Sequence, residues 1–543
     1  MLALLVGGAV SLGGCGDEHS GARGPEFVPG AVDVVPRPAD VKVDAQGSAF
    51  VFDERTTLVR GAAEASAAAN LLFEILRGPF PARPEPTGAP AAPARSNSVI
   101  LTTAGADPAL GPEGYELEVT PTHIRLRAVA PAGFVHGVQT LRQLLPPEVE
   151  RRAPAPGVVW SVPSVQIRDL PRFAWRGLLI DTSRFFLPKE FLLRQLELLA
   201  LYKLSVLHLH LTDDQGWRLE IDSYPALHER GSQWDAERAP DERGGYYSKD
   251  DIRAIVARAG ELGIEVVPEI DMPGHMVAAL HAMPELACQT APDAPRSADE
   301  FPIVTWLERP LSDAVLCVCD ERVYDVMQAV LDEVIELFPS PFIHVGGDEV
   351  AQLGEWERSY LCQELIASGS VEGVDHLQAY FEKRIEDHLR ARGRRMIAWD
   401  EALTAERPDR PDERLSSAAA FMFWRDFMPA PDRLYERDVV AVPFSRLYFD
   451  YPTVIQRAYG LDPAPEQLSA EQAAHVLGAQ AAMWTGFPNG RSEEGVERHI
   501  FPRLLALAEL AWTPQALRDF DDFNRRLETQ ARRLEVLGVE LGP

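Results

Sequence analysis

The stretch that decides the fold reads Phe342-Ile343-His344-Val345-Gly346-Gly347-Asp348-Glu349. Its apolar start is typical of a buried strand, its two glycines leave room at the strand exit, and its two acids follow directly. The same order of short apolar strand, polar exit and amphipathic helix recurs from Phe173 onward. Strands are expected at residues 177–181, 206–211, 264–270, 342–346, 395–399, 418–424, 439–449 and 477–484, and helices between them include 189–202, 249–262, 321–338 and 374–391. Eight such units predict an α/β fold with a (β/α)8 TIM barrel, in which active-site groups lie just past the carboxyl ends of the strands.

The barrel is expected to be one of several parts of this 543-residue chain. Strand-like stretches at 98–102, 115–119 and 124–128 and a helical stretch at 135–145 lie between proline-rich loops, which predicts a smaller α/β support domain. The expected parts are a leader at 1–15, a tether at 16–32, the support domain at 33–170, the barrel at 171–513 and a C-terminal helix at 514–543.

The composition excludes several classes of protein. With 46% hydrophobic and 25% charged residues, the chain can bury an ordinary globular core, which rules out wholesale disorder. The 53 Lys+Arg against 82 Asp+Glu leave a net charge of −29, so the phosphate backbone of a nucleic acid would be repelled. Neutral or cationic partners remain compatible with this charge.

The first fifteen residues have the pattern of a cleaved leader. The apolar run from Leu2 to Leu12 is too short to span a bilayer, and it ends in Leu12-Gly13-Gly14-Cys15, which resembles the bacterial lipobox. An ordinary signal peptide or a misassigned start is the alternative, because no Lys or Arg precedes the apolar run. We expect an exported bacterial protein, with a membrane tether through acylated Cys15 as one outcome.

Four further cysteines invite a pairing scheme. In an exported protein, Cys288 pairing with Cys317 or with Cys319 would staple a long loop-like segment, and the sequence does not choose between the two. Cys362 lies on an expected helix. The single residue between Cys317 and Cys319 lacks the two-residue gap of a zinc knuckle, which argues against a metal here.

Reactive residue types gather at the strand ends. They are Arg176 before the first strand, Asp213 and Asp214 after the second, His275 after the third, Asp348 and Glu349 after the fourth, Asp400 and Glu401 after the fifth, and Trp399, Trp424, Tyr448, Asp450 and Trp484 around the ring. Indole faces stack on the CH faces of a sugar while carboxylates bind its hydroxyl groups. The set therefore indicates a carbohydrate site.

The adjacent acids Asp348 and Glu349 are the centre of that interpretation. An Asp-Glu pair alone is most often a solvated turn, but a position after Gly-Gly on a barrel strand favours function. Two close carboxylates cannot both ionise freely, so the pKa of one is expected to rise and leave a proton donor near neutral pH.

A metal-dependent hydrolase is the rival hypothesis from another mechanistic class. His208 and His210 lie two residues apart on one strand and so share a face, as in barrel enzymes that bind a metal through such a pair. Further ligands would be His275 or His344. Because Leu211 and Thr212 follow before the acids, hydrogen-bonded core histidines are the favoured interpretation. His275, delivered by a Pro-Gly turn, is instead expected to relay to the catalytic acid with Asp213 orienting it.

These motifs resemble glycoside hydrolase family 20, the β-N-acetylhexosaminidases. The segments that carry the resemblance are 175–181 (WRGLLID), 208–218 (HLHLTDDQGWR), 268–275 (PEIDMPGH), 344–349 (HVGGDE), 398–401 (AWDE) and 502–504 (PRL), preceded by 114–117 (GYEL) and 137–145 (GVQTLRQLL) in the smaller domain. The resemblance covers nearly the whole chain beyond the leader. It implies a small carbohydrate, oligosaccharide or glycan substrate, and neither a cofactor nor a metal ion.

The resemblance also implies roles for single residues. Glu349 would be the general acid/base and Asp348 would hold the substrate acetamido group, whose carbonyl oxygen attacks the anomeric carbon in a retaining, substrate-assisted reaction. The expected partners are Tyr448 on the acetamido oxygen, Trp399, Trp424 and Trp484 lining the pocket, Arg176 on the non-reducing-end hydroxyls, and Asp213 with His275 tuning Glu349. Whether Asp213 or Asp214 points inward is left open, with Asp213 favoured.

One position departs from the family pattern. Two residues after the last tryptophan the family usually has a Glu that binds the outer hydroxyls, and here Trp484-Thr485-Gly486 has glycine. A lost charge-assisted hydrogen bond is worth about 1.5 to 3 kcal/mol, so weaker discrimination between gluco and galacto substrates is expected. Either Asp450, Glu493 or Glu494 takes the place of the missing Glu, or the pocket accepts a sugar that is altered or extended at that edge. A carbohydrate-binding protein on a catalytically dead barrel is the non-enzymatic alternative, which the presence of both Asp348 and Glu349 disfavours.

Overall fold

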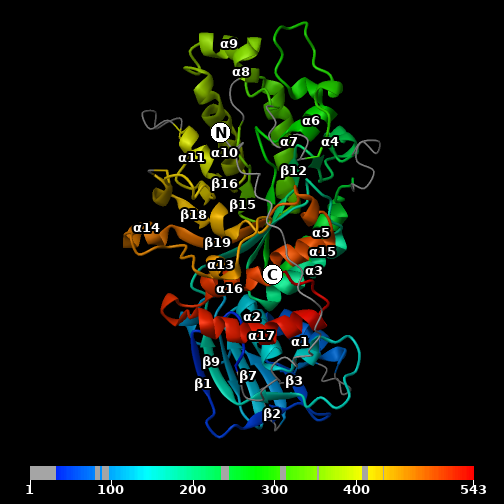
Figure 1. The fold of residues 1–543 in the computed structure, drawn as a ribbon, viewed down its shortest axis with the longest axis vertical. Helices are drawn as coiled ribbons and strands as arrows, with labels where there is room; N and C mark the ends of the chain where they lie inside the picture. Colours follow the sequence, from blue (N-terminus) through cyan, green and yellow to red (C-terminus); the bar gives the residue numbers. More distant parts are fainter. Residues whose placement is uncertain are drawn as a thin grey trace, which may run out of the picture.

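The fold was taken from a computed structural model of the whole chain (Figure 1). It describes residues 32–79, 86–88, 97–233, 244–305, 314–350, 354–406, 414–431 and 433–542. The expected leader at 1–15 and almost all of the tether at 16–32 lie outside the described residues. No helix in the described part is both long and apolar enough to cross a membrane.

A closed barrel of eight parallel strands forms the larger part of the molecule. Its strands are β10 (Trp175–Asp181), β11 (Val206–His210), β14 (Glu265–Glu269), β15 (Phe342–His344), β16 (Arg395–Trp399), β17 (Ala420–Phe423), β18 (Asp438–Ala441) and β19 (Val476–Met483), in that order. β10 pairs with both β11 and β19, which closes the ring. The predicted TIM barrel is therefore confirmed.

Helices surround the barrel as the apolar periodicity predicts. They include α3 (Lys189–Leu201), α5 (Lys249–Glu261), α7 (Glu321–Leu337), α10 (Leu377–Ala391) and α16 (Arg503–Trp512). The prediction of one long strand over 439–449 is wrong, because β18 ends at Ala441 and a short helix, α12 (Phe444–Leu447), follows Pro443. Tyr448 and Asp450 thus lie on a loop after α12 rather than on a strand.

The smaller domain is a seven-stranded sheet with two helices. The strand order is β1 (Asp40–Val43), β9 (Val165–Asp169), β6 (Tyr115–Val119), β7 (His123–Ala128), β5 (Ser98–Thr102), β3 (Thr57–Arg60) and β4 (Pro86–Gly88), with β2 (Ala49–Val51) and β8 (Ser161–Pro163) paired beside it. α1 (Ser66–Arg77) and α2 (Pro131–Leu144) lie between this sheet and the barrel (Figure 1). The side chains of α2 from residue 133 on are buried because the helix packs against both domains.

The C-terminal helix α17 (Phe520–Val536) crosses the junction of the two domains (Figure 1). Its Arg533 donates to Glu150 of the smaller domain at 2.6 Å, and its Arg526 donates to Glu509 of α16 at 2.5 Å. All four side chains are buried. The C-terminal helix therefore fastens the smaller domain to the barrel through buried ion pairs.

Two disulfides staple the long loops near the carboxyl end of the barrel. Cys288 bonds to Cys317, one of the two partners that the sequence left open, and Cys319 bonds to Cys362. The second bond was missed because its two cysteines are 43 residues apart and one lies on α9 (Tyr360–Ala367).

Candidate active site

The turn after β15 carries the two adjacent acids at the carboxyl end of the barrel. Gly346 has φ 71°, and a Cβ there would lie 1.6 Å from an Asp271 carboxylate oxygen, so only glycine fits. Glu349 itself adopts φ 44°, which is uncommon for a residue with a side chain. In a regular strand two consecutive side chains would point to opposite faces, but this turn lets the side chains of Asp348 and Glu349 both face one histidine.

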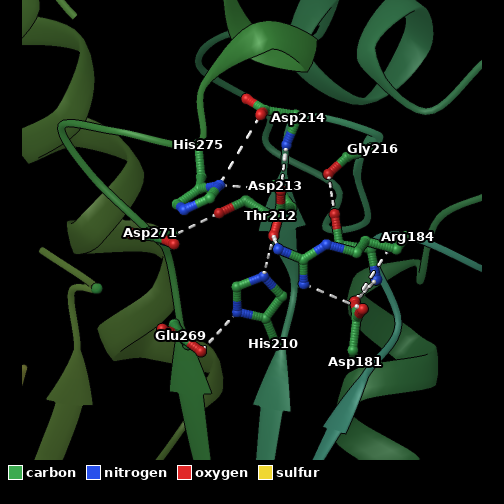
Figure 2. Close-up of polar contacts among 12 residues, drawn as sticks. Asp181, Arg184, His210, Thr212, Asp213, Asp214, Gly216, Glu269, Asp271 and His275 are labelled. Atoms are coloured by element: carbon green, nitrogen blue, oxygen red, sulfur yellow. Dashed lines mark hydrogen bonds and ion pairs between the residues drawn. The ribbon is translucent and has the colours of Figure 1, made fainter. Parts of the chain in front are cut away.

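That histidine is His275. Its Nε2 lies 3.7 Å from Asp348 Oδ2 and 3.6 Å from Glu349 Oε2. Its Nδ1 lies 3.3 Å from Asp213 Oδ1 and 3.8 Å from Asp214 Oδ2, on the other side of the ring (Figure 2). His275 therefore joins the acids after β11 to the acids after β15, as a relay requires.

Asp213 rather than Asp214 is the centre of the acidic side. Asp213 Oδ2 lies 2.8 Å from His210 Nε2 and 2.6 Å from the Arg184 guanidinium (Figure 2). Asp214 Oδ1 instead accepts the backbone N–H of Val277. Asp213 thus connects His275 to two further groups inside the barrel. Asp214 mainly fixes the loop that carries His275.

The charges of this cluster are distributed unequally. Burial raises the pKa of Asp348 to about 6. Burial also opposes ionisation of Glu349, but its contact with His275 outweighs burial and lowers the Glu349 pKa. Asp213 likewise outweighs the burial of His275 and raises the pKa of that ring well above its usual value. The predicted rise in one carboxyl pKa therefore falls on Asp348, while Glu349 is the ionised partner of a His275 cation.

Four aromatic side chains lie together beside these acids and form one side of the candidate site. Trp484 lies 6.1 Å from both Trp399 and Tyr448, and Trp424 stacks on Tyr448 at 5.9 Å between ring centroids. Burial and the nearby charge of Asp348 raise the pKa of Tyr448 well above 10, so its hydroxyl keeps its proton beside the acids. The sequence-predicted aromatic residues are thus brought together around the turn that carries the acids.

Two further acids lie in this region with raised pKa values. Glu401, at the start of α11 (Asp400–Ala405), accepts the indole N–H of Trp424 at 2.9 Å, and burial together with Asp348 raises its pKa to about 8. Burial raises the pKa of Asp450 to about 8, and its Oδ1 has no hydrogen-bond partner among the described residues. Such unpaired buried oxygens are ready to bind the hydroxyl groups of a ligand.

Arg176 is the predicted site residue that the structure does not bring to the pocket. It lies near the amino end of β10, where its guanidinium binds Glu113 of the smaller domain at 2.5 Å and the carbonyl oxygen of Lys203 at 2.8 Å. The arginine at the carboxyl end of the same strand is Arg184, whose guanidinium lies 4.8 Å from the Trp484 ring centroid. Its position three residues after the end of β10 was the signal that could have found it.

The histidines of the rival metal hypothesis are bound by the protein's own acid. His210 Nδ1 lies 2.6 Å from Glu269 Oε2, and its Nε2 binds Asp213 (Figure 2). His208 Nε2 lies 3.2 Å from the same Glu269 oxygen, and the other Glu269 oxygen accepts the indole N–H of Trp399. Both nitrogens of His210 are therefore occupied by carboxylates, and Glu269 connects the relay to the pocket wall.

Gly486 lies beside the aromatic wall in a well-anchored loop. Its carbonyl oxygen accepts a hydrogen bond from Arg491 at 2.9 Å, and the preceding Thr485 donates its N–H to Asp181 at 3.0 Å. The residue is buried. The position therefore supplies backbone but no carboxylate to the outer edge of the pocket.

Comparisons with known proteins agree with this geometry. A model of the glycosyl hydrolase family 20 catalytic domain matches residues 173–515, and a model of domain 2 of that family matches residues 31–170. A β-hexosaminidase of Porphyromonas gingivalis is 34% identical over 98% of this chain and 66% of its own length, and a β-N-acetylhexosaminidase of Cellulomonas fimi is 30% identical over 92% and 94%.

Solved structures show the same architecture. The GH20 β-N-acetylhexosaminidase of Streptomyces coelicolor A3(2) superposes with a TM-score of 0.79 at 30% identity, covering 94% of this chain and 97% of its own. A mutant β-hexosaminidase of Streptomyces plicatus, in complex with its product GlcNAc, superposes with a TM-score of 0.80 at 30% identity over 96% and 98%. The chain described here belongs to glycosyl hydrolase family 20.

Proposed function

We propose that this protein is an exo-β-N-acetylhexosaminidase that releases terminal, non-reducing β-linked GlcNAc or GalNAc with retention of configuration. The observation that carries the proposal is the contact of one histidine, His275, with both Asp348 and Glu349 beside a wall of Trp399, Trp424 and Trp484. Family membership supports the same activity, since relatives named β-hexosaminidase match almost the whole chain.

The reaction is proposed to use the substrate's own acetamido group. Protonated Glu349 gives its proton to the glycosidic oxygen as the bond to C1 breaks, and the acetamido carbonyl oxygen attacks C1 from the opposite face. The product is a cationic oxazolinium ring, which the Asp348 carboxylate stabilises through the ring N–H while Tyr448 donates to the ring oxygen. Glu349 then takes a proton from water, whose oxygen attacks C1 and opens the ring. No protein nucleophile is needed.

The proton that Glu349 donates is proposed to come from His275. In the free site Glu349 is ionised and His275 is a cation, with 3.6 Å between Nε2 and the Glu349 oxygen. Transfer across this contact gives a neutral imidazole and a protonated Glu349. Asp213, whose Oδ1 lies 3.3 Å from His275 Nδ1, then orients the neutral imidazole ring.

The test uses the electronic demand of the acetamido group. A series of aryl glycosides with acetyl, fluoroacetyl, difluoroacetyl and trifluoroacetyl groups on the amine makes the carbonyl oxygen a progressively weaker nucleophile. We expect kcat/KM to fall steeply along the series. A flat series would overturn the substrate-assisted mechanism, and GlcNAc binding without turnover of the parent glycoside would instead favour the catalytically dead barrel.

The non-reducing end of the sugar is proposed to lie between Arg184, Asp450 and Trp484. A guanidinium and an unpaired carboxyl oxygen offer a donor and an acceptor to adjacent hydroxyls, and the indole offers an apolar face. Gly486 removes the second carboxylate of this edge. We therefore propose that GlcNAc and GalNAc are discriminated weakly.

We also propose export with acylation at Cys15, on the pattern Leu12-Gly13-Gly14-Cys15. Two disulfides support an oxidising compartment. Intact-mass analysis of the protein from its natural host tests this proposal. A diacylglycerol or triacyl mass on a chain that begins at Cys15 is the expected result, and an unmodified Cys15 would contradict it.

A further inference from the structure

Gly347, the residue immediately before the two acids, is held through both of its backbone polar groups. The N–H of Gly347 donates to Asp271 Oδ1 at 3.3 Å, and the carbonyl oxygen of Gly347 accepts from Gln378 Nε2 at 2.8 Å. Gly347 adopts φ 90°. Because glycine reaches many other backbone conformations at little cost, it would leave this one without hydrogen bonds that hold it. The orientation of the Gly347–Asp348 peptide, whose carbonyl oxygen binds Gln378, sets the direction in which the next two residues leave the strand.

Gln378 is itself fixed from behind by a second residue of α10. Its Nε2 also donates to Glu382 Oε1 at 2.8 Å, one helical turn further along. An amide nitrogen has two hydrogens, so these two acceptors use both of them. The bond to Glu382 therefore holds the Gln378 side chain in the rotamer that also binds the Gly347 carbonyl oxygen.

Glu382 is built into this place rather than exposed beside it. Its side chain is 1% exposed, and a Cβ on Gly347 would lie 3.0 Å from its Oε1. Burial, reinforced by the charge of Glu406, raises the pKa of Glu382 to about 8, so it is neutral at pH 7 and accepts through one oxygen without adding a charge. Its other oxygen has no hydrogen-bond partner among the described residues.

We propose that Gln378 and Glu382 are positioning residues, which act through Gly347 to aim Asp348 and Glu349 at the substrate. The inference rests on the proposed function, because it takes Asp348 and Glu349 to be the groups that act on the substrate. Gln378 and Glu382 do not have to touch the sugar to have this effect. A released Gly347 peptide would turn, and reacting groups displaced by about 1 Å can cost about 10²-fold in rate.

The experiment compares four single variants of the full chain. Gln378→Met keeps the length and volume of the side chain but removes the donor, and Glu382→Met removes the acceptor. Glu382→Gln keeps an acceptor oxygen and is the conservative rescue. Glu386→Gln is the matched control, since Glu386 lies one turn further on the same helix, is equally buried at 2% exposed, and lies 3.7 Å from Lys383 instead.

We expect Gln378→Met and Glu382→Met to lower kcat by about 10- to 100-fold. KM should change less than threefold and Tm should stay near the wild-type value for Gln378→Met. Glu382→Gln and Glu386→Gln should keep wild-type kcat. The loss should be larger for p-nitrophenyl than for 2,4-dinitrophenyl N-acetylglucosaminide, because the better leaving group depends less on a well-aimed Glu349.

Wild-type kcat in Gln378→Met would overturn the proposal. An equal fall of kcat in Glu386→Gln, or a fall in Tm that accounts for the lost activity, would also overturn it, because helix α10 would then act only as scaffold. Failure of the proposed function is distinguishable, since in that case the unmodified chain itself would not turn over the aryl glycoside.

Discussion

At both ends of the barrel acids pair with cations, but at the carboxyl end three acids have raised pKa values because burial outweighs the nearby cations. At the amino end, Arg176 binds Glu113 and Lys203 binds Asp169 at 2.9 Å, with cation and anion matched across the domain junction. At the carboxyl end, Asp450 is buried, and Asp348 and Glu401 are half-buried. His275 lies 3.7 Å from Asp348 and Arg425 lies 3.6 Å from Glu401, but burial outweighs both cations and raises the pKa values of these acids.

The pKa values express the difference. Although burial opposes it, Arg176 outweighs burial and lowers the pKa of Glu113 to about 2, whereas burial raises the pKa of Glu401 and of Asp450 to about 8. An acid whose cation outweighs its burial stays ionised and stabilises the folded chain, whereas an acid whose burial outweighs the nearby cations costs free energy when it ionises. Buried charge therefore joins the two domains at the amino end of the barrel, and it accompanies the candidate binding site at the carboxyl end.

The largest expected effect is on kcat and concerns the two acids at the carboxyl end of the barrel. Glu349→Gln should lower kcat on an N-acetylglucosaminide with a poor leaving group by about 10³-fold or more, because the donated proton is lost. Asp348→Asn should lower kcat by about 10²- to 10³-fold, because the oxazolinium ion loses its carboxylate. Initial rates measure both, and Tm should not fall in either variant. Near-wild-type kcat in Asp348→Asn would contradict the role of Asp348.

At the amino end of the barrel, a substitution should instead change the free energy of unfolding. Arg176→Met leaves Glu113 buried without its cation, so the free energy of unfolding should fall by about 3 kcal/mol. Denaturant unfolding at pH 7 measures the change. KM per folded molecule should be unchanged, and the double variant Arg176→Met with Glu113→Gln should recover part of the loss. A raised KM for the aryl glycoside would show that Arg176 belongs to the pocket after all.

Stability against pH separates the two ends next. Glu401 and Asp450 ionise near pH 4 in the unfolded chain but only near pH 8 in the folded one, so the unfolded state holds fewer protons in this window. Their contribution therefore lowers the free energy of unfolding as pH rises from about 4 to about 8. Glu401→Gln should remove its share and be more stable than the wild type by about 2 kcal/mol at pH 8, with little difference at pH 4. Equal slopes in the two proteins would contradict the raised pKa.

The smallest effect concerns the outer edge of the pocket. Gly486→Glu adds a carboxylate where the edge has only backbone, so the ratio of kcat/KM for the gluco and galacto p-nitrophenyl substrates should change by up to about tenfold. Gly486→Gln is the uncharged control and should change the ratio less. An unaltered ratio in Gly486→Glu would mean that Asp450 and Arg184 already set the selectivity.

Much of the site follows from local sequence patterns. The position of Asp348 and Glu349 after Gly346-Gly347, and of His275 after a Pro-Gly turn, placed these residues at strand ends, and the structure brings His275 within 4 Å of both acids. The site role of Arg176 came from the family resemblance, although the sequence already placed this residue before the first expected strand. β10 begins at Trp175, which puts Arg176 at the amino end.

The amino-acid sequence by itself determined the barrel, the smaller domain and the identity of the two adjacent acids, because hydrophobic periodicity and strand-exit chemistry are local properties of the chain. Only the tertiary structure decided that the Arg184 guanidinium lies 4.8 Å from the Trp484 ring centroid, that Cys319 pairs with Cys362, and that Asp348 rather than Glu349 has the raised pKa. These depend on burial and on distances between residues far apart in the chain, such as the 3.6 Å between His275 and Glu349.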